Sequence, residues 1–165
     1  PAKVALLQFT LDPALLDAAG VDVIIVHLEP DGSDGQVGAF VRETLGEPFY
    51  RDGDYAAYEV PPYTGAAPQL TTYVDGATLY VYAPQESTYT LVGQVAALER
   101  AAVVALDGVP LLEWQARDAQ NLRVPVRVPA GYHAISVRAE PPCPPQTDPA
   151  LLCAPLEISG LDVVE

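Results

Sequence analysis

The chain is poor in several residue types, and each scarcity excludes a class of protein. Of its 165 residues only 8 are Lys or Arg, against 22 Asp and Glu, which gives a formal net charge of -14. Such a charge repels phosphate backbones and anionic lipid headgroups, so no nucleic acid is expected as a partner. No run of about 18 apolar residues occurs, and no basic segment precedes a short apolar one. We therefore expect neither a membrane span nor a signal peptide in this sequence.

Met is absent, and Asn and Lys occur once each, while 17 residues are Pro. Few thermolabile side chains and many prolines are typical of heat-adapted proteins, so we expect a thermophile source. The sequence starts with Pro-Ala-Lys directly before an apolar segment. We interpret the chain as an excised fragment or a processed mature chain.

Motifs that would indicate catalysis or cofactor binding are missing as well. The sequence has no Gly-x-Ser-x-Gly, no Gly-rich phosphate loop and no cluster of His and Cys with zinc spacing. Its two histidines, His27 and His133, are isolated, so we expect each to be structural or exposed. No catalytic residue and no cofactor other than a possible calcium ion is predicted.

The two cysteines, Cys143 and Cys153, flank a Pro-rich loop. A disulfide across a loop of this size would stabilise the fold by roughly 2–3 kcal/mol in the chain-entropy model. It would also imply an oxidising compartment. The alternative is a pair of unpaired thiols, one of them buried. The disulfide is the favoured prediction, because the spacing matches no Cys-x-x-Cys motif.

Residues 1–62 have the pattern of a small α/β segment. Asp12 and Pro13 predict the N-cap and first position of a short helix, which Gly20 ends. Residues 23–26 form a continuous β-branched run, which predicts a strand buried on both faces, as in a parallel sheet. A helix over 37–45 should cover one face of that sheet, and residues 48–60 should form a hairpin around Asp52-Gly53. Residues 4–9 fit a strand or a helix equally well.

The Pro- and Gly-containing stretch 61–68 is the only linker-like segment, so we place the domain boundary between residues 62 and 63. From residue 63 to 165 apolar residues recur at every second position, with turns about every ten residues. About eight strands result, including hairpins at Asp107-Gly108 and Ala130-Gly131 and a β-bulge at Ser159-Gly160. The predicted fold class is α+β: a small α/β segment followed by an antiparallel β-sandwich, either jelly-roll-like or related to it.

Residues 122–128 make up the clearest of these strands. Leu122, Val124, Val126 and Val128 are expected to face inward, while the residues between them face water. Pro125 predicts an edge strand, because proline cannot donate a ladder hydrogen bond.

One acidic turn is a candidate calcium site. Its oxygen-bearing residues alternate around Gly32 and are Glu29, Asp31, Ser33 and Asp34. Calcium favours carboxylate-rich turns that contain Gly, but the remaining ligands of an EF-hand loop are missing. The alternative is a solvated turn in which Asp34 caps the helix that follows.

Tyrosine is the abundant aromatic residue of the second segment. Tyr80 and Tyr82 share one side of a predicted strand, and Trp114 lies further along. Exposed aromatic rings stack on the apolar C–H face of a sugar, so these three residues are candidates for glycan contact. The same alternation would also place aromatics where one sheet packs on another, or where the sandwich packs on the α/β segment, which is the alternative interpretation.

Short motifs between residues 18 and 60 contain Gly20, Val21, His27, Gly46, Pro48, Tyr50, Asp52, Tyr58 and Val60. At these residues the motifs resemble a recurring pattern in the C-terminal, extracytoplasmic regions of bacterial polytopic membrane proteins of the glycosyltransferase type. The later segments LYVYAP, VALDG and VPAGYHAISV resemble the β-sandwich often appended there. Asp22 departs from the pattern, since an aromatic is usual at its position.

This resemblance implies a noncatalytic accessory domain outside the cytoplasm, at the cell surface or in the periplasm. The domain would be tethered through the transmembrane portion of its parent protein, which would be its partner together with a glycan or polypeptide acceptor. In that family the catalytic acids lie in the transmembrane part, so the resemblance transfers no catalytic residue to this chain. Two other hypotheses remain: a carbohydrate-binding module of a secreted or surface protein, and a small hydrolase whose acid pair forms only on folding.

Overall fold

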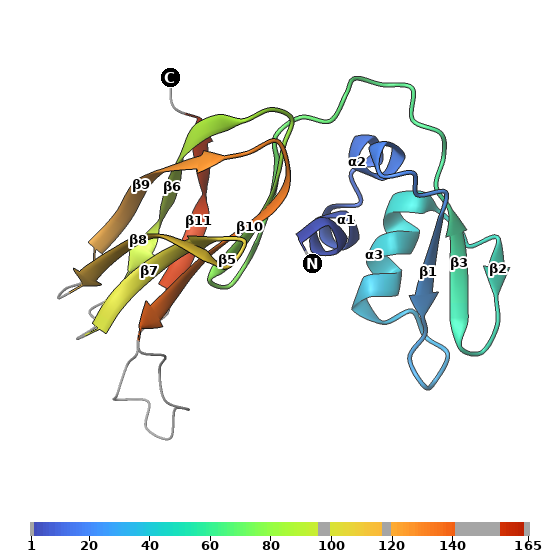
Figure 1. The fold of residues 1–165 in the computed structure, drawn as a ribbon. Coiled ribbons are helices and arrows are strands. Elements are labelled where there is room, and N and C mark those ends of the chain that lie inside the picture. Colours follow the sequence, from blue (N-terminus) through green and yellow to red (C-terminus); the bar gives the residue numbers. More distant parts are fainter. Residues whose placement is uncertain (1, 96–99, 117–119, 141–155, 164–165) are drawn as a thin grey trace. The chain divides into compact units, whose positions relative to one another are not determined.

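The computed structural model describes residues 2–95, 100–116, 120–140 and 156–163. The chain forms two compact units (Figure 1). The smaller consists of Leu7–Pro68, and the larger consists of Gln69–Glu165 together with Pro1–Leu6. The predicted boundary at residue 62 falls a few residues before the end of the smaller unit. Cys143 and Cys153 lie outside the described residues, so their disulfide stays a prediction.

Three helices and three strands precede residue 68. The helices are α1 (Ala2–Thr10), α2 (Pro13–Ala18) and α3 (Gly35–Leu45), and the strands are β1 (Val23–His27), β2 (Tyr50–Arg51) and β3 (Tyr55–Glu59). Residues 4–9, which fitted two interpretations, are thus helical. The cap of α2 is confirmed: the Asp12 carboxylate accepts hydrogen bonds from the N–H groups of Ala14 at 2.9 Å and Leu15 at 3.2 Å. Gly20, with φ of 67°, ends this segment.

The expected parallel sheet was wrong. The three strands lie in the order β1-β3-β2, and both neighbouring pairs are antiparallel. The strand β1 is therefore an edge strand, and only alternate side chains point into the core. Ile25 is 67% exposed, whereas Val26 is 6% exposed. A β-branched run marks a strand but does not by itself show how many layers cover it.

One face of this sheet packs against helices. Val41 of α3 meets Val26 of β1 and Tyr58 of β3 in a core that also contains Leu11 and Leu16. Figure 1 shows α3 running alongside the strands of this unit. The hairpin of β2 and β3 is confirmed, although its two-residue turn is Gly53-Asp54, because the Asp52 N–H donates to the Tyr55 carbonyl at 3.0 Å.

The larger unit is an antiparallel β-sandwich, as predicted. Its five-stranded sheet has the order β4-β5-β10-β7-β8, and its three-stranded sheet has the order β11-β6-β9. The strands are β4 (Thr71–Asp75), β5 (Thr78–Ala83), β6 (Ser87–Val95), β7 (Arg100–Leu106), β8 (Val109–Ala116), β9 (Gln120–Val128), β10 (Gly131–Glu140) and β11 (Leu156–Val163). Within the described part of this unit, eight strands are thus present, the number expected from the turn spacing.

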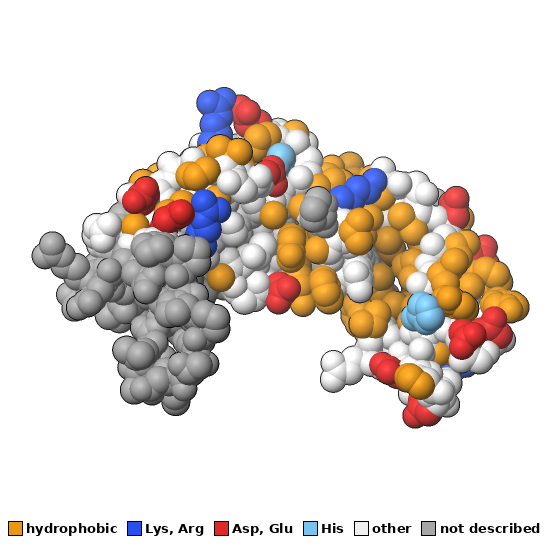
Figure 2. All heavy atoms as spheres, turned by 60° about the horizontal axis from the view of Figure 1, so that its bottom comes forward, with side chains coloured by type: hydrophobic (Ala, Val, Ile, Leu, Met, Phe, Trp, Pro, Cys, Tyr) orange, Lys and Arg blue, Asp and Glu red, His pale blue; other side chains and the backbone are white. Residues whose placement is uncertain are grey.

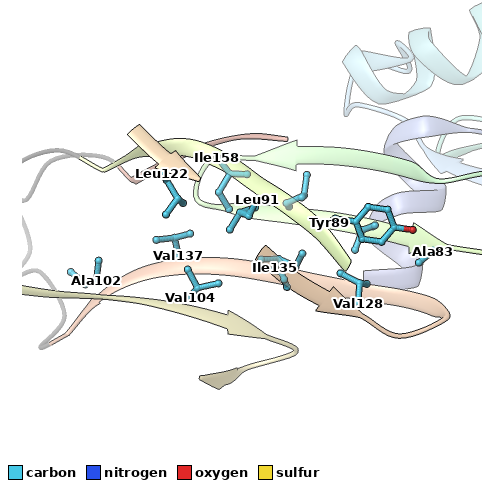
Figure 3. Close-up of a cluster of buried hydrophobic side chains, with 14 residues drawn as sticks. Ala83, Tyr89, Leu91, Ala102, Val104, Leu122, Val128, Ile135, Val137 and Ile158 are labelled. Atoms are coloured by element: carbon cyan, nitrogen blue, oxygen red, sulfur yellow. The ribbon is translucent and has the colours of Figure 1, made fainter. Parts of the chain in front are cut away.

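The sandwich core lies between the two sheets (Figure 3). Leu91 and Ile158 come from the three-stranded sheet, and Val104, Ile135 and Val137 come from the five-stranded sheet. Each of these five side chains is less than 5% exposed. Burial of this many branched side chains between two layers is the main source of stability of the unit.

Details of the sandwich follow the sequence pattern closely. In β9, Leu122, Val126 and Val128 are buried and Val124 is half-buried, while Pro125 is exposed and the strand lies at a sheet edge. Asp107 and Gly108 both have positive φ, 51° and 83°, as a two-residue turn between right-twisted strands requires. The register of β11 against β6 shifts between Ile158 and Gly160, which confirms the bulge.

Candidate functional site

The tyrosines of β5 lie on the outer face of the five-stranded sheet. Leu79, Val81 and Ala83 are fully buried in the sandwich core. Because successive side chains of a strand point to opposite faces, Tyr80 and Tyr82 point away from that core. Both are half-buried. Tyr80 and Tyr82 thus do not lie between the two sheets, which was one of the two packing alternatives.

Neighbouring strands add two more tyrosines to this face. Tyr73 of β4 pairs with Tyr80, and Tyr132 of β10 pairs with Tyr82. The ring centroids of Tyr82 and Tyr132 are 4.9 Å apart with an interplanar angle of 55°. We refer to Tyr73, Tyr80, Tyr82 and Tyr132 as the tyrosine face. Three adjacent strands thus hold four aromatic side chains on one face of the sheet.

The rings of the tyrosine face differ in what covers them. The Lys3 ammonium lies 5.7 Å from the centroid of the Tyr132 ring, a cation–π contact within the larger unit. Tyr132 thus has one ring face occupied, and its hydroxyl oxygen is buried. We interpret Tyr132 as a support that orients Tyr82, and Tyr73, Tyr80 and Tyr82 are each half-buried.

Short polar side chains surround these rings. Thr71 lies beside Tyr82, and Thr78 pairs with Asp75 on one side and Ser136 on the other. Further along β10, the guanidinium of Arg138 donates to Glu140 at 3.4 Å. Hydroxyl and carboxylate groups next to aromatic rings can bind the hydroxyl groups of a sugar whose C–H face stacks on a ring.

Trp114, the third predicted glycan-contact residue, lies on another strand. It belongs to β8, the edge of the five-stranded sheet farthest from β4, and pairs with Ala102 of β7. Its side chain lies outside the described part of the structure. Two strands, β7 and β10, separate it from β5, so the structure brings Tyr80 and Tyr82 together but not Trp114 with them.

The acidic turn of the smaller unit is held by its own hydrogen bonds. The Asp31 carboxylate accepts from the Ser33 N–H at 2.9 Å, and hydrogen bonds from Ser33 lower the pKa of Asp31. The Glu29 N–H donates to the Ser33 carbonyl at 2.9 Å. Among the described residues, no three His, Cys, Asp or Glu side chains are grouped as a metal ion would require. Calcium binding by Glu29, Asp31, Ser33 and Asp34 gains no support from this geometry.

Asp34 has a different role from the cap we expected. It occupies the N-cap position of α3, but its side chain makes no capping hydrogen bond. Its carboxylate instead pairs with Arg42 at 2.8 Å and Arg51 at 2.6 Å. Arg51 also donates to the carbonyl of Gly32 at 2.6 Å. Two ion pairs with arginines stabilise the Asp34 carboxylate more than one capping hydrogen bond would. They also connect the β2–β3 hairpin to the start of α3.

Both histidines have structural partners, as predicted. The His27 ring lies 4.3 Å from the Tyr55 ring. His133 Nδ1 lies 2.7 Å from Oδ2 of Asp107, and Oδ1 of Asp107 accepts from the Ala134 N–H at 2.9 Å. The Asp107 carboxylate thus joins the turn between β7 and β8 to the adjacent strand β10.

A second candidate surface was not predicted from the sequence. It is the face of the β1-β3-β2 sheet opposite the helices, which we name the open face and define by Val23, Ile25, His27, Tyr50, Tyr55 and Ala57. Ile25 is 67% exposed and Tyr50 is 53% exposed. Figure 2 shows hydrophobic side chains gathered on this unit with acidic side chains beside them. This exposed face was not expected, because the β-branched run of residues 23–26 predicted a strand covered on both faces.

No family model and no curated protein matches this chain. Among solved structures, a family 35 carbohydrate binding module from Clostridium thermocellum is 18% identical, with a TM-score of 0.32, over 54% of this chain and 83% of that chain. A family 35 module from an environmental isolate is 19% identical, with a TM-score of 0.35, over 62% of this chain and 76% of that one. These values assign neither a family nor a ligand to this chain.

In the described part of the structure, no helix is long and apolar enough to cross a membrane.

Proposed function

We propose that the chain is a noncatalytic carbohydrate-binding accessory module whose ligand stacks on the tyrosine face. The observation that carries this proposal is the position of Tyr80 and Tyr82 outside the sandwich core, beside Tyr73. A rigid sheet with aromatic side chains on its outer face binds ligands with little loss of side-chain entropy, because the strands already hold the rings in place. The sandwich acts as a scaffold for the rings.

The spacing of the rings suits a short oligosaccharide. Adjacent strands lie about 4.8 Å apart, and residues on the same face of one strand lie about 6.7 Å apart. The Cα atoms of Tyr73, Tyr80 and Tyr82 thus lie within about 8 Å of one another. With a net charge of -14, the protein repels polyanions, which favours a neutral glycan over an acidic one.

We propose further that this module belongs to an extracytoplasmic region of a membrane glycosyltransferase-like protein. The support for this proposal is the resemblance of short motifs in residues 18–60, which include His27 and Tyr50, to the pattern of that family. The test is the full reading frame that encodes the chain. Several hydrophobic segments of membrane-spanning length are expected in it, and their absence would contradict this context but leave sugar binding open.

Titration calorimetry with oligosaccharides chosen from a glycan array tests sugar binding. Replacing Tyr80→Ala or Tyr82→Ala should cost roughly 0.5–1.5 kcal/mol of binding free energy each, about two- to tenfold in Kd, because each change removes a stacking surface. Tyr55→Ala is the matched control: it removes an exposed tyrosine of the smaller unit and should leave glycan affinity unchanged.

Two results would contradict the proposal. One is an array without signal for any neutral glycan. The other is glycan binding that persists at full affinity in a folded Tyr80→Ala, Tyr82→Ala double variant. The same glycans should also be incubated with the protein and checked for cleavage, because turnover would show that the module is an enzyme.

A further inference from the structure

The outer edge of β1 presents unused backbone hydrogen-bonding groups. The Val60 N–H donates to the Asp22 carbonyl at 2.9 Å, and the Leu28 N–H donates to the Asp54 carbonyl at 2.8 Å. Both hydrogen bonds join residue pairs that continue the antiparallel register of β1 and β3 by one residue at either end. Since hydrogen-bonded and non-hydrogen-bonded pairs alternate in an antiparallel ladder, residues 24 and 26 also bond to β3. The N–H and C=O groups of Val23, Ile25 and His27 therefore point away from β3.

These outward groups have no partner in the part of the chain that the structure describes. No hydrogen bond to the backbone of Val23, Ile25 or His27 occurs there, and β1 is the edge of its sheet. Proteins usually protect such an edge with a proline, a charged side chain, a bulge or a covering element. Between residues 23 and 27 the sequence is Val-Ile-Ile-Val-His, with no proline and no lysine, and its pairing with β3 is regular.

Charge determines which partner fits this edge. Residues 7–68 hold eleven acidic residues and only two basic ones, Arg42 and Arg51, a formal charge of -9. Both arginines pair with Asp34, so neither offsets the charge near β1. Asp22 and Glu29 flank the strand, and Glu59 lies opposite Val23; all three are exposed. An apolar edge between acidic residues is complementary to a segment with apolar residues and flanking Lys or Arg.

We propose that β1 binds an extended segment of another polypeptide, basic and apolar in alternation, which adds to the β1-β3-β2 sheet as a fourth strand. The backbone of the segment would bond to the outward groups of Val23, Ile25 and His27. Its apolar side chains would extend the open face beside Ile25, and its basic side chains would meet the acidic rim. Strand addition of this kind takes its affinity from main-chain hydrogen bonds and its specificity from side chains.

Charge also argues against a second copy of this chain as the occupant. An antiparallel pair of β1 strands centred on Ile25 would bring Asp22 of one copy close to Glu29 of the other, at both ends of the ladder. Two units of charge -9 would approach each other as well. Self-association is therefore the competing outcome in the test.

The test uses the full chain and three synthetic peptides: one alternating Lys and Val, one alternating Glu and Val, and one alternating Lys and Gly. Fluorescence anisotropy should show binding of the Lys-Val peptide, at least tenfold weaker binding of the other two, and a decline of affinity with added salt. Amide exchange should slow at Val23, Ile25 and His27 on binding, but not at residues 24 and 26, which already bond to β3.

Ile25→Pro is the decisive variant, because it removes an outward N–H without removing a bond to β3. It should fold, as judged by circular dichroism, and bind the Lys-Val peptide at least tenfold more weakly. Ile25→Lys should also weaken binding, by placing a positive charge at the edge, and it keeps the test valid if the proline variant does not fold. Val109→Lys, which adds the same charge at an exposed position of the larger unit, is the control and should bind as the parent does.

Three outcomes would overturn the proposal. The first is equal binding of the Lys-Val and Glu-Val peptides. The second is peptide binding at full affinity by folded Ile25→Pro or Ile25→Lys. The third is a concentration-dependent dimer, seen by analytical ultracentrifugation without peptide, that protects the same three amides, since a second copy would then occupy the edge.

Discussion

Asp52 illustrates how one carboxylate organises a turn in this protein. It accepts hydrogen bonds from the N–H groups of Asp54 and Tyr55, both at 2.8 Å, and from the Tyr50 hydroxyl at 2.8 Å. The bonds from Asp54 and Tyr55, followed by that from Tyr50, lower the pKa of Asp52, and the same contact raises the pKa of Tyr50. The ionised carboxylate is thus the form that the folded hairpin prefers.

The lowered pKa predicts a pH dependence for the hairpin. A carboxyl group whose pKa is lower in the folded state stabilises the fold above its unfolded pKa, about 3.9 for Asp, and loses that effect as the pH falls through the folded value. We expect Asp52→Ala to speed amide exchange at Tyr55 at neutral pH, and the difference from the parent chain to shrink in acid below about pH 4. NMR-detected exchange measures this.

Tyr50→Phe provides the control for this pH dependence. It removes one donor to the carboxylate and leaves the two backbone donors in place, so the pKa of Asp52 should rise only partly toward its ordinary value. An Asp52 carboxyl that titrates at the ordinary value in the parent chain would contradict the role assigned to it.

At the scale of single elements, the β7–β8 hairpin depends on backbone conformation. Gly108 has φ of 83°, where an L side chain is strained, although a Cβ there would meet no atom within 4 Å. Gly108→Ala should therefore destabilise the sandwich by about 1 kcal/mol through strain alone. Denaturant unfolding monitored by amide exchange in β7 and β10 measures this change.

Gly53 provides the matched comparison. It also lies in a two-residue hairpin turn and has open space around it, but its φ is outside the positive range. Gly53→Ala should leave the stability of the smaller unit almost unchanged. Equal losses for the two substitutions would show that positive φ is not the cause.

At the scale of the whole molecule, the two units have separate cores. Ile135 and Leu91 belong to one buried cluster, and Val41 and Tyr58 belong to the other. Ile135→Ala leaves a cavity and should destabilise the sandwich by about 2–4 kcal/mol. Amide exchange should become faster in β5, β7 and β10, while β3 keeps the protection of the parent chain.

Val41→Ala is the reciprocal variant. It should speed amide exchange in β1 and β3 and leave exchange in the sandwich strands unchanged. The reason is that Val41 belongs to the buried cluster of the smaller unit and not to that of the sandwich. A single substitution that destabilised both units equally would contradict the separation of the cores.

Local signals in the sequence determined much of this fold. The alternation from Leu122 to Val128, the Asp107-Gly108 turn, the edge position of Pro125 and the bulge at Gly160 were all predictable. Each depends on interactions within a few residues or on a period of two. The sharing of one strand side by Tyr80 and Tyr82 was predictable for the same reason.

Tertiary structure alone decided the features that depend on distant residues. Which layer covers β1, which strands carry Tyr73 and Tyr132 beside Tyr80 and Tyr82, and which arginines hold Asp34 all follow from strand order and from contacts between separate elements. Burial and ion pairing are set by neighbours in space, and a single sequence does not specify those neighbours.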